Sequence, residues 1–526
     1  MKIGRILALV LALMMALTMM ASAEEITFPL EEPIEVTVYV CTGDSAYSLE
    51  ETAIYKWMEE KTNVHLKVLY STNTTENTEK LNILMNTGDY PDVLFKSGIS
   101  PEQLSDLGGE GVILALDDLL QYVPNYCAII DERGDWPAVT SSDGHIYSLF
   151  EISKPNVGNT PHMWINQQWL DNLGLTMPTN PDEFYNVLKA FKEQDADGDG
   201  DPSNEIPWIA SGDITPVEDI MPLFGFNMQG WWDPWVVSED GQSIEFFPAT
   251  ERYKDVLALI TKCYEEGLLY KDTFSITNEQ ICAMGQTGES IGVFCHWHPG
   301  NVVGYYDKNA EVNHITEYVA MVPFEGAKWP TAGGLNRGGF AITDKCEYPE
   351  IMMAWVNLMY SEEGVRVANY GIEGDTYDLV DGQVKMRDKD NPSETWGENV
   401  GHALLQMGGG VFAPITTYTE LDTYYDLEAD PTCRVLLDTY EKFEELDKFY
   451  PAWPALALTE EESQANADIN AYADAYRLSY RAEVITGKKN LDETWDEYLE
   501  TLNKMGLQTA VDNMNAAYTR YLGVAE

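Results

Sequence analysis

A strand–helix–strand–helix–strand order near the start of the chain limits the fold more than any other feature. Residues 34–40 and 64–70 alternate apolar or β-branched residues with polar ones, which is typical of strands. Residues 52–61 and 75–85 have apolar residues at helical spacing, and residues 88–95 form a turn that leads into a third short strand. This order predicts an α/β fold with a parallel, doubly wound sheet.

The first 23 residues have the pattern of a secretory signal. Lys2 and Arg5 precede an apolar run over residues 6–20, and Ala21-Ser22-Ala23 follows as a cleavage site. We therefore expect an exported chain. No cysteine lies at the end of the signal, since the first is Cys41, so the sequence does not favour a lipid anchor.

The charge of the chain excludes two classes of partner. The 526 residues carry a formal net charge of −55. Nucleic acids and anionic membrane surfaces are bound through basic patches, so we expect neither as a partner. The length suits two or three domains, and no later stretch is apolar for long enough to span a bilayer.

An acidic, glycine-containing loop over residues 195–205 is the sharpest chemical signal. Oxygen ligands at alternate positions, with glycines that allow a tight wrap, are what calcium needs. The candidate ligands are Asp195, Asp197, Asp199, Asp201 (through its backbone carbonyl) and Glu205. An EF-hand loop would have glutamate at the twelfth position, where this chain has Ile206. A solvated acidic turn is the alternative, but four close aspartates repel one another without a cation, so we favour a structural calcium.

The segments before this loop read as two helices. Residues 164–173 have near-helical apolar spacing, and Gly174 is expected to end that helix. Asn180 or Thr179 can cap a second helix that buries apolar residues up to Phe191.

Several aromatic and planar polar residues could bind a sugar, because sugars need flat apolar faces for C–H groups and polar groups for hydroxyls. Tryptophans in large α/β proteins are usually core, so each assignment has a structural alternative. His296 and His298 flank one candidate, but at i and i+2 they point to opposite faces of an extended chain and do not favour a metal site. The candidates are Trp231, Trp232 and Trp235 in one loop, Trp297 after a strand, and Arg337, Tyr377 and Trp396.

Motifs along the chain resemble those of bacterial extracellular solute-binding proteins of family 1, in the long branch that carries a calcium loop. The matching stretches are residues 88–95 (GDYPDVLF), 143–149, 164–207, the G-x-E-G-x-x-Y turn at 371–377 and residues 485–507. The resemblance implies a two-lobed, maltose-binding-protein-like fold, in which each lobe has a mainly parallel sheet and the ligand cleft lies between the lobes. It also implies these boundaries: signal 1–23, lobe 1 at 24–150, lobe 2 at 151–317, a return to lobe 1 at 318–375, and further lobe 2 with C-terminal helices at 376–526.

The same resemblance implies the function. We expect a monomeric receptor of an ABC importer, which closes on an oligosaccharide and delivers it to membrane permease subunits without bond chemistry. A secreted glycoside hydrolase is an alternative, although no catalytic motif marks a carboxylate pair. A receptor for peptide or another polar solute is a second alternative, and a calcium-dependent adhesive module is a third.

Overall fold

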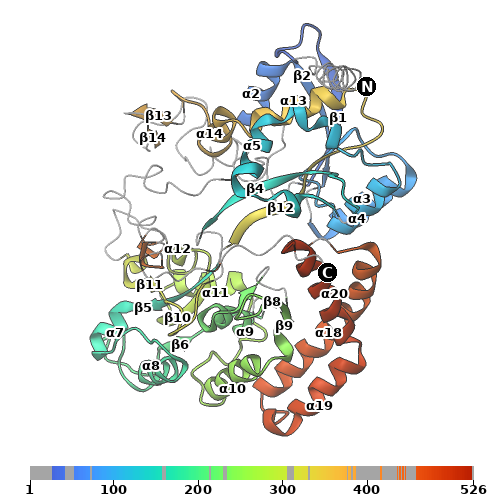
Figure 1. The fold of residues 1–526 in the computed structure, drawn as a ribbon. Coiled ribbons are helices and arrows are strands. Elements are labelled where there is room, and N and C mark those ends of the chain that lie inside the picture. The colour runs from blue at the N-terminus through green and yellow to red at the C-terminus, as the bar shows by residue number, and fades with distance from the viewer. Residues whose placement is uncertain are drawn as a thin grey trace, which may run out of the picture.

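The computed structural model describes residues 26–41, 52–71, 74–141, 143–156, 161–212, 215–228, 234–304, 313–329, 332–375, 377–380, 383–386, 415–416 and 458–523, with isolated residues between 435 and 456. Figure 1 shows an upper body, lobe 1, and a lower body, lobe 2. The expected signal at 1–23 lies outside the described residues.

Lobe 1 is built on a six-stranded sheet in the order β15–β4–β12–β3–β1–β2. Strand β1 runs parallel to both β2 and β3, with α2 and α3 as the connecting helices, which confirms the expected doubly wound start. The strands are β1 (Ile34–Cys41), β2 (Val64–Ser71), β3 (Val93–Phe95), β4 (Leu149–Asn156), β12 (Ala332–Ile342) and β15 (Ile415–Thr416).

Two strands of this sheet carry the chain between the lobes. β4 leads toward lobe 2 and β12 returns, so the two pair antiparallel (Figure 1). β12 is irregular between Asn336 and Phe340, where its register against β4 shifts as in a β-bulge. In each sheet, one end is the point from which the chain passes to the other lobe. We name it the crossing end. In lobe 1 the carboxyl ends of β1, β2, β3 and β4 all lie there.

Lobe 2 contains a four-stranded sheet in the order β11–β5–β10–β6. Two of its three pairings are antiparallel, so the expected mainly parallel sheet is wrong for this lobe. The reason is that β5 enters from lobe 1 and runs opposite to β6 and β10. The crossing end here holds the start of β5 and the carboxyl ends of the other three strands, which are β6 (Ile206–Trp208), β10 (Ile291–His296) and β11 (Tyr318–Ala320), while β5 spans His162–Asn166.

Smaller elements complete the fold. One three-stranded sheet contains β7 (Asn227–Met228), β8 (Trp235–Val237) and β9 (Ile244–Phe246), and a hairpin joins β13 (Tyr377–Val380) to β14 (Gln383–Met386). The α-helices are α2 (Ala53–Thr62), α3 (Thr74–Thr87), α4 (Pro101–Gly109), α5 (Pro124–Arg133), α6 (Trp136–Val139), α7 (Gln167–Leu173), α8 (Pro181–Glu193), α9 (Pro216–Ile220), α10 (Glu251–Glu265), α11 (Asn278–Gln286), α12 (Pro299–Val303), α13 (Pro349–Met359), α14 (Glu362–Tyr370), α18 (Glu460–Ile485), α19 (Leu491–Lys504) and α20 (Leu507–Tyr521). Short 3₁₀ helices span Asp117–Tyr122, Met221–Phe224, Phe247–Ala249 and His314–Glu317.

The two expected helices before the acidic loop are only partly correct. Helix α8 begins after Asn180, whose side chain accepts a hydrogen bond from the Glu183 N–H, and it buries its apolar face as expected. The segment 164–173 is not one helix, because Trp164 belongs to β5 and α7 starts at Gln167. All five residues of β5 are buried, so the strand has no polar alternation to distinguish it from a buried helix.

Two of the expected domain boundaries are corrected by the strand pairing. Residues 318–323 were expected in lobe 1, but β11 pairs with β5 and covers an otherwise open side of that strand. Residues 376–526 were expected outside lobe 1, but β15 pairs with β4 in the larger sheet.

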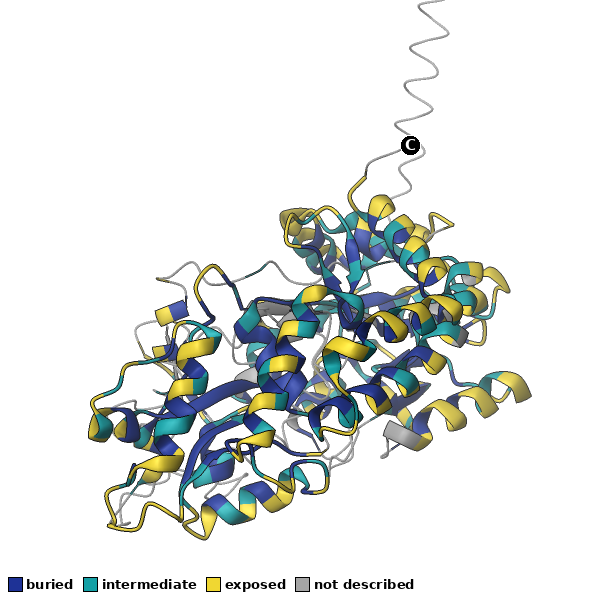
Figure 2. Cartoon of the chain, turned by 90° about the horizontal axis from the view of Figure 1, so that it is seen from below, coloured by how far each residue is buried: buried dark blue, intermediate teal, exposed yellow. Residues whose placement is uncertain are grey.

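Each sheet is enclosed by its own apolar core, and the C-terminal helices complete that of lobe 2. Figure 2 shows buried strands inside and helices whose outer faces are exposed. Trp495, Tyr498 and Tyr518 belong to the same buried cluster as Trp208 and Phe191. Helix α18 packs on α10 of lobe 2 and also contacts α4 of lobe 1.

Candidate functional site

An exposed tryptophan marks the crossing end of lobe 2. Trp297 directly follows β10, and its residue surface is 45% exposed. It is the only exposed tryptophan among the residues that the structure describes. Ligands of open α/β sheets bind at the carboxyl ends of strands, which is where this side chain lies.

The residues on both sides of Trp297 are held by hydrogen bonds. The carbonyl oxygen of His296 accepts a hydrogen bond from the indole Nε1 of Trp164 at 2.8 Å. On the other side, the Nδ1 of His298 accepts from the Gly300 N–H at 3.0 Å and caps α12. The backbone that carries the exposed ring is therefore fixed before any ligand binds.

The ring of His296 is buried and neutral. Burial, with a smaller contribution from His298, lowers the pKa of His296 from 6.5 to about 4. Its Nδ1 lies 3.4 Å from the His298 backbone N–H and 3.0 Å from the Asn301 Nδ2, and its Nε2 lies 3.2 Å from the Asn278 Nδ2. These contacts give His296 a structural role.

The other sugar-binding candidates lie in different parts of the structure. Trp235 is buried in the lobe 2 core, where its ring packs edge-on against Phe246, so it presents no face to a ligand. Tyr377 is also buried, and it interacts with Arg366 of α14. Arg337 lies in the irregular part of β12 at the crossing end, and only its backbone is described. Trp231, Trp232 and Trp396 lie outside the described residues.

Sequence reasoning missed a charged pair at the crossing end of lobe 1. Lys96 follows β3, and its Nζ lies 3.1 Å from the Oε1 of Glu151 on β4. A lysine after a strand carries no sequence signal of its own. The feature that singles it out is its backbone φ of 46°, which only the structure provides.

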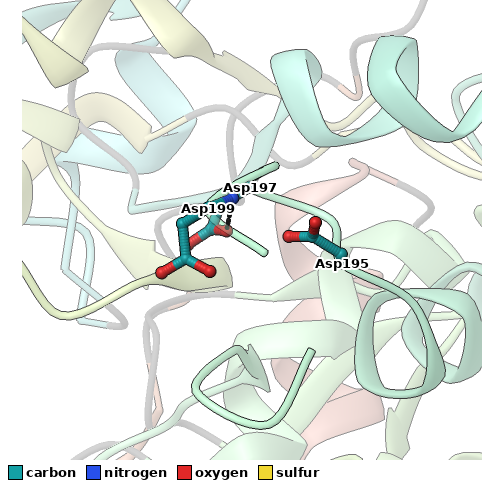
Figure 3. A group of neighbouring side chains, drawn as sticks. All are labelled: Asp195, Asp197 and Asp199. Atoms are coloured by element: carbon teal, nitrogen blue, oxygen red, sulfur yellow. Dashed lines mark hydrogen bonds between the residues drawn. The ribbon is translucent and has the colours of Figure 1, made fainter. Parts of the chain in front are cut away.

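The acidic loop lies at the opposite end of the lobe 2 sheet. Ligand atoms of Asp195, Asp197 and Asp199 all lie within 4.8 Å of one another, and Figure 3 shows their carboxylates gathered around one space. Oxygens bound to one calcium ion are at most about 5 Å apart, so this spacing fits the ion. Gly198 and Gly200 have φ values of 80° and 95°, which the tight wrap requires.

Hydrogen bonds explain how the loop is shaped and where it is anchored. The Oδ1 of Asp197 accepts from the Asp199 N–H at 3.0 Å (Figure 3), and the Oδ2 of Asp195 accepts from the Gly200 N–H at 3.1 Å. The hydroxyl of Ser290, just before β10, donates to the Oδ2 of Asp197 at 2.5 Å. The loop is thus tied to the start of the strand that ends beside Trp297.

Two buried oxygens of the loop point to a cation. The Oδ1 of Asp195 and the Oε2 of Glu205 are buried and have no hydrogen-bond partner. The other oxygen of Glu205 accepts from the Ala196 N–H at 2.8 Å, and burial raises the pKa of this carboxyl. A buried carboxylate oxygen without a partner is costly, and a hard cation would satisfy it. Asp201 is exposed, and its carboxylate accepts from Ser203, which leaves its carbonyl as its expected contribution.

A pocket of about 280 Å³ lies beside the loop. Its walls include Asp197, Glu289 and Glu317, and its tryptophan and tyrosine, Trp169 and Tyr318, are almost fully buried. The pocket therefore lacks an aromatic face for a sugar, and it lies away from the crossing end.

These features define a two-lobed binding protein with an aromatic platform at the crossing end of one lobe. The chain belongs to the bacterial extracellular solute-binding protein family, whose model matches residues 42–366. None of the helices in the described part of the chain combines the length and the apolar composition of a membrane-spanning segment.

Named relatives agree with this assignment. The chain is 29% identical to the fructooligosaccharide ABC transporter substrate-binding protein FusA of Streptococcus pneumoniae, over 95% of this chain and 92% of FusA. The structure of FusA in complex with kestose matches 93% of this chain and all of that chain, with 24% identity and a TM-score of 0.73. A FusA variant described as an EF-hand mutant has the same TM-score. A human-milk-oligosaccharide-binding (HMO-binding) solute-binding protein of Bifidobacterium longum infantis matches 94% of this chain and 99% of that chain, with 22% identity and a TM-score of 0.75.

Proposed function

We propose that this protein is the substrate-binding component of an ABC importer and captures an oligosaccharide between its two lobes. The observation that carries the proposal is Trp297, an exposed ring on a fixed backbone at the crossing end of lobe 2. An aromatic face of this kind stacks on the C–H face of a sugar ring. The names of FusA and of the Bifidobacterium protein support the same ligand class.

The capture follows from how strands connect the lobes. β4 and β12 are the strands that connect them, so a hinge motion about this ribbon brings the two crossing ends together around the ligand. The closed protein, acting as a monomer, delivers the oligosaccharide to the membrane permease subunits, and no bond is made or broken. The signal at residues 1–23 exports the chain to the cell exterior.

Calcium is the ion that we assign to the acidic loop. Asp195, Asp197, Asp199 and Glu205 would hold it through carboxylates, and Asp201 through its backbone carbonyl. The bound ion would neutralise the loop and keep it against Ser290 and the start of β10. Its role is to stabilise lobe 2, because the loop lies at the far end of the sheet from Trp297.

The test is thermal unfolding of the full chain with a panel of kestose, longer fructooligosaccharides, milk oligosaccharides, uronate oligosaccharides and peptides. A ligand present at 100 times its dissociation constant stabilises the native state by about 2.7 kcal/mol, which is a clear shift of the midpoint. We expect one glycan class to raise the midpoint and to be recovered uncut by chromatography. Cleavage of the glycan would instead establish a glycoside hydrolase, and a shift with peptides alone would overturn the sugar assignment.

A further inference from the structure

Lys96 has a backbone conformation that its residue type disfavours. Only two non-glycine residues in the described part of the chain have a positive φ, Asn63 at 59° and Lys96 at 46°. Asn63 ends helix α2, and asparagine tolerates this conformation well. Lys96 has no such reason, because its β-carbon is crowded in the left-handed region. Backbone strain of this kind gathers at functional sites.

The surrounding backbone holds Lys96 in this conformation. Its N–H donates to the Gly339 carbonyl at 2.9 Å, and its carbonyl accepts from the Cys41 N–H at 3.3 Å. Gly339 lies in the irregular part of β12, where an added β-carbon would lie 2.6 Å from the backbone nitrogen of Glu151. Strands β1, β3 and β12 therefore meet around Lys96 at the crossing end of lobe 1.

The strained backbone positions a charged pair. The side chains of Lys96 and Glu151 are only 12% and 21% exposed, and their charged atoms lie 3.1 Å apart. Burial lowers the pKa of Lys96, while the Glu151 carboxylate acts in the opposite direction. Both side chains keep a small exposed surface at the base of the β4–β12 ribbon, where the chain passes toward lobe 2.

We propose that the Lys96–Glu151 pair is a polar contact of lobe 1 with the ligand and selects an uncharged oligosaccharide, an inference that rests on the proposed function. The ammonium group donates and the carboxylate accepts, so together they match neighbouring sugar hydroxyls. The pair has no net charge to attract a uronate. An acidic sugar would instead meet Glu151 and the field of a chain with a net charge of −55.

The first test is isothermal titration of the full chain with kestose and with a milk oligosaccharide. Lys96→Met keeps the length of the side chain but removes its donors, so we expect about 10- to 100-fold weaker binding. Lys96→Gly relieves the backbone strain but, like Lys96→Met, leaves the Glu151 carboxylate without its counter-charge, so we expect the same loss of binding with an unfolding midpoint above that of Lys96→Met. A merely structural lysine would lower the midpoint of both variants and leave the affinity unchanged, and that result would overturn the proposal.

Two controls match these variants. Lys61→Met removes an exposed ion pair with Glu363, and Asn63→Gly changes the other left-handed residue. We expect both to leave the affinity unchanged.

The second test addresses the charge of the ligand. Glu151→Gln leaves Lys96 without its counter-charge, so we expect weaker binding of the neutral sugar and a relative gain for a galacturonate trisaccharide of at least about tenfold. Preference of the wild type for the galacturonate would overturn the selectivity. If Trp297→Ala weakens binding while Lys96→Met does not, this inference fails and the proposed function stands. If no glycan binds the wild type, both fail.

Discussion

Trp164 and His296 join neighbouring strands of lobe 2 through a hydrogen bond from the indole Nε1 to the carbonyl oxygen, 2.8 Å long. Both residues are buried, and β5 and β10 also pair at His162 and His296. The position of the next residue, Trp297, is therefore determined by the core of the sheet and not by a loop alone.

Replacing Trp297 with alanine should weaken ligand binding and spare the fold. Loss of a stacking ring that a ligand covers costs about 1.5–3 kcal/mol, or about 10- to 150-fold in affinity. Titration calorimetry measures this loss, and Trp297→Phe should recover part of it. The matched control is Tyr472→Ala on α18, another exposed aromatic. Equal affinities of Trp297→Ala and wild type would remove Trp297 from the site.

The stability of the protein should fall in acid because of His296. Burial keeps its pKa at about 4 in the folded chain, against 6.5 in the unfolded chain. Between these values only the unfolded state takes up the proton, so stability falls as pH decreases from 6.5 to 4. The drop in pKa corresponds to about 3 kcal/mol. Urea unfolding at pH 7, 5.5 and 4 measures the free energy of unfolding. Between pH 7 and 4, the loss of this free energy should be smaller in His296→Asn than in the wild type by about 3 kcal/mol. Parallel pH profiles of the two proteins would contradict the prediction.

Chelation of calcium should lower the unfolding midpoint. Without the ion, the carboxylates of residues 195–205 repel one another and two buried oxygens stay without partners. Binding at 100 times the dissociation constant is worth about 2.7 kcal/mol. Scanning fluorimetry with calcium and with chelator measures the shift.

The paired variant Asp195→Asn/Asp197→Asn should abolish that calcium dependence. Asp496→Asn on α19, which removes one exposed carboxylate elsewhere, should retain it. If the unfolding midpoint of the wild type is the same with calcium and with chelator, the loop is an acidic turn without a bound ion.

Replacing Glu218 with glutamine should destabilise lobe 2 strongly. This buried carboxylate on α9 forms ion pairs with Arg481 and Arg477 of α18. Burial opposes its ionisation, but the Arg481 guanidinium lowers the pKa of Glu218. Removing the carboxylate leaves the buried Arg481 uncompensated, while Arg477 keeps its ion pair with Asp474, and a buried charge left in this way costs about 3–5 kcal/mol.

The control for Glu218 is an exposed ion pair of similar type. Glu483→Gln breaks the contact with Lys489, whose charged atoms lie 2.8 Å apart, and should cost about 1 kcal/mol or less. Urea unfolding compares the two variants. Similar losses for both would show that the buried pair contributes no more than a surface pair.

Local patterns were enough to predict much of the fold. The alternation in residues 34–40 and the cap at Asn180 act within a few residues, so β1 and α8 are where the sequence places them. The parallel start followed from the order of elements alone. β11 could not be placed in this way, since its pairing with β5 depends on a contact between segments about 150 residues apart.

The candidate site was harder to predict for the same reason. The acidic loop is local, and its three aspartates do gather around one space. Burial is not local, so Trp235 and Trp297 look alike in sequence although one is core and the other exposed. The strain at Lys96 arises where β1, β3 and β12 meet, and no sequence pattern expresses it.

The C-terminal helices have a consequence for how the chain reaches its native state. The Tyr498 hydroxyl donates a hydrogen bond to the Pro248 carbonyl, and the Asn515 side chain accepts one from the Ile244 N–H, so residues of α19 and α20 close contacts with segments far earlier in the chain. Such distant contacts raise the contact order and slow folding. Lobe 2 cannot complete its core until α20 has been synthesised, which favours an unfolded, translocation-ready chain up to that point.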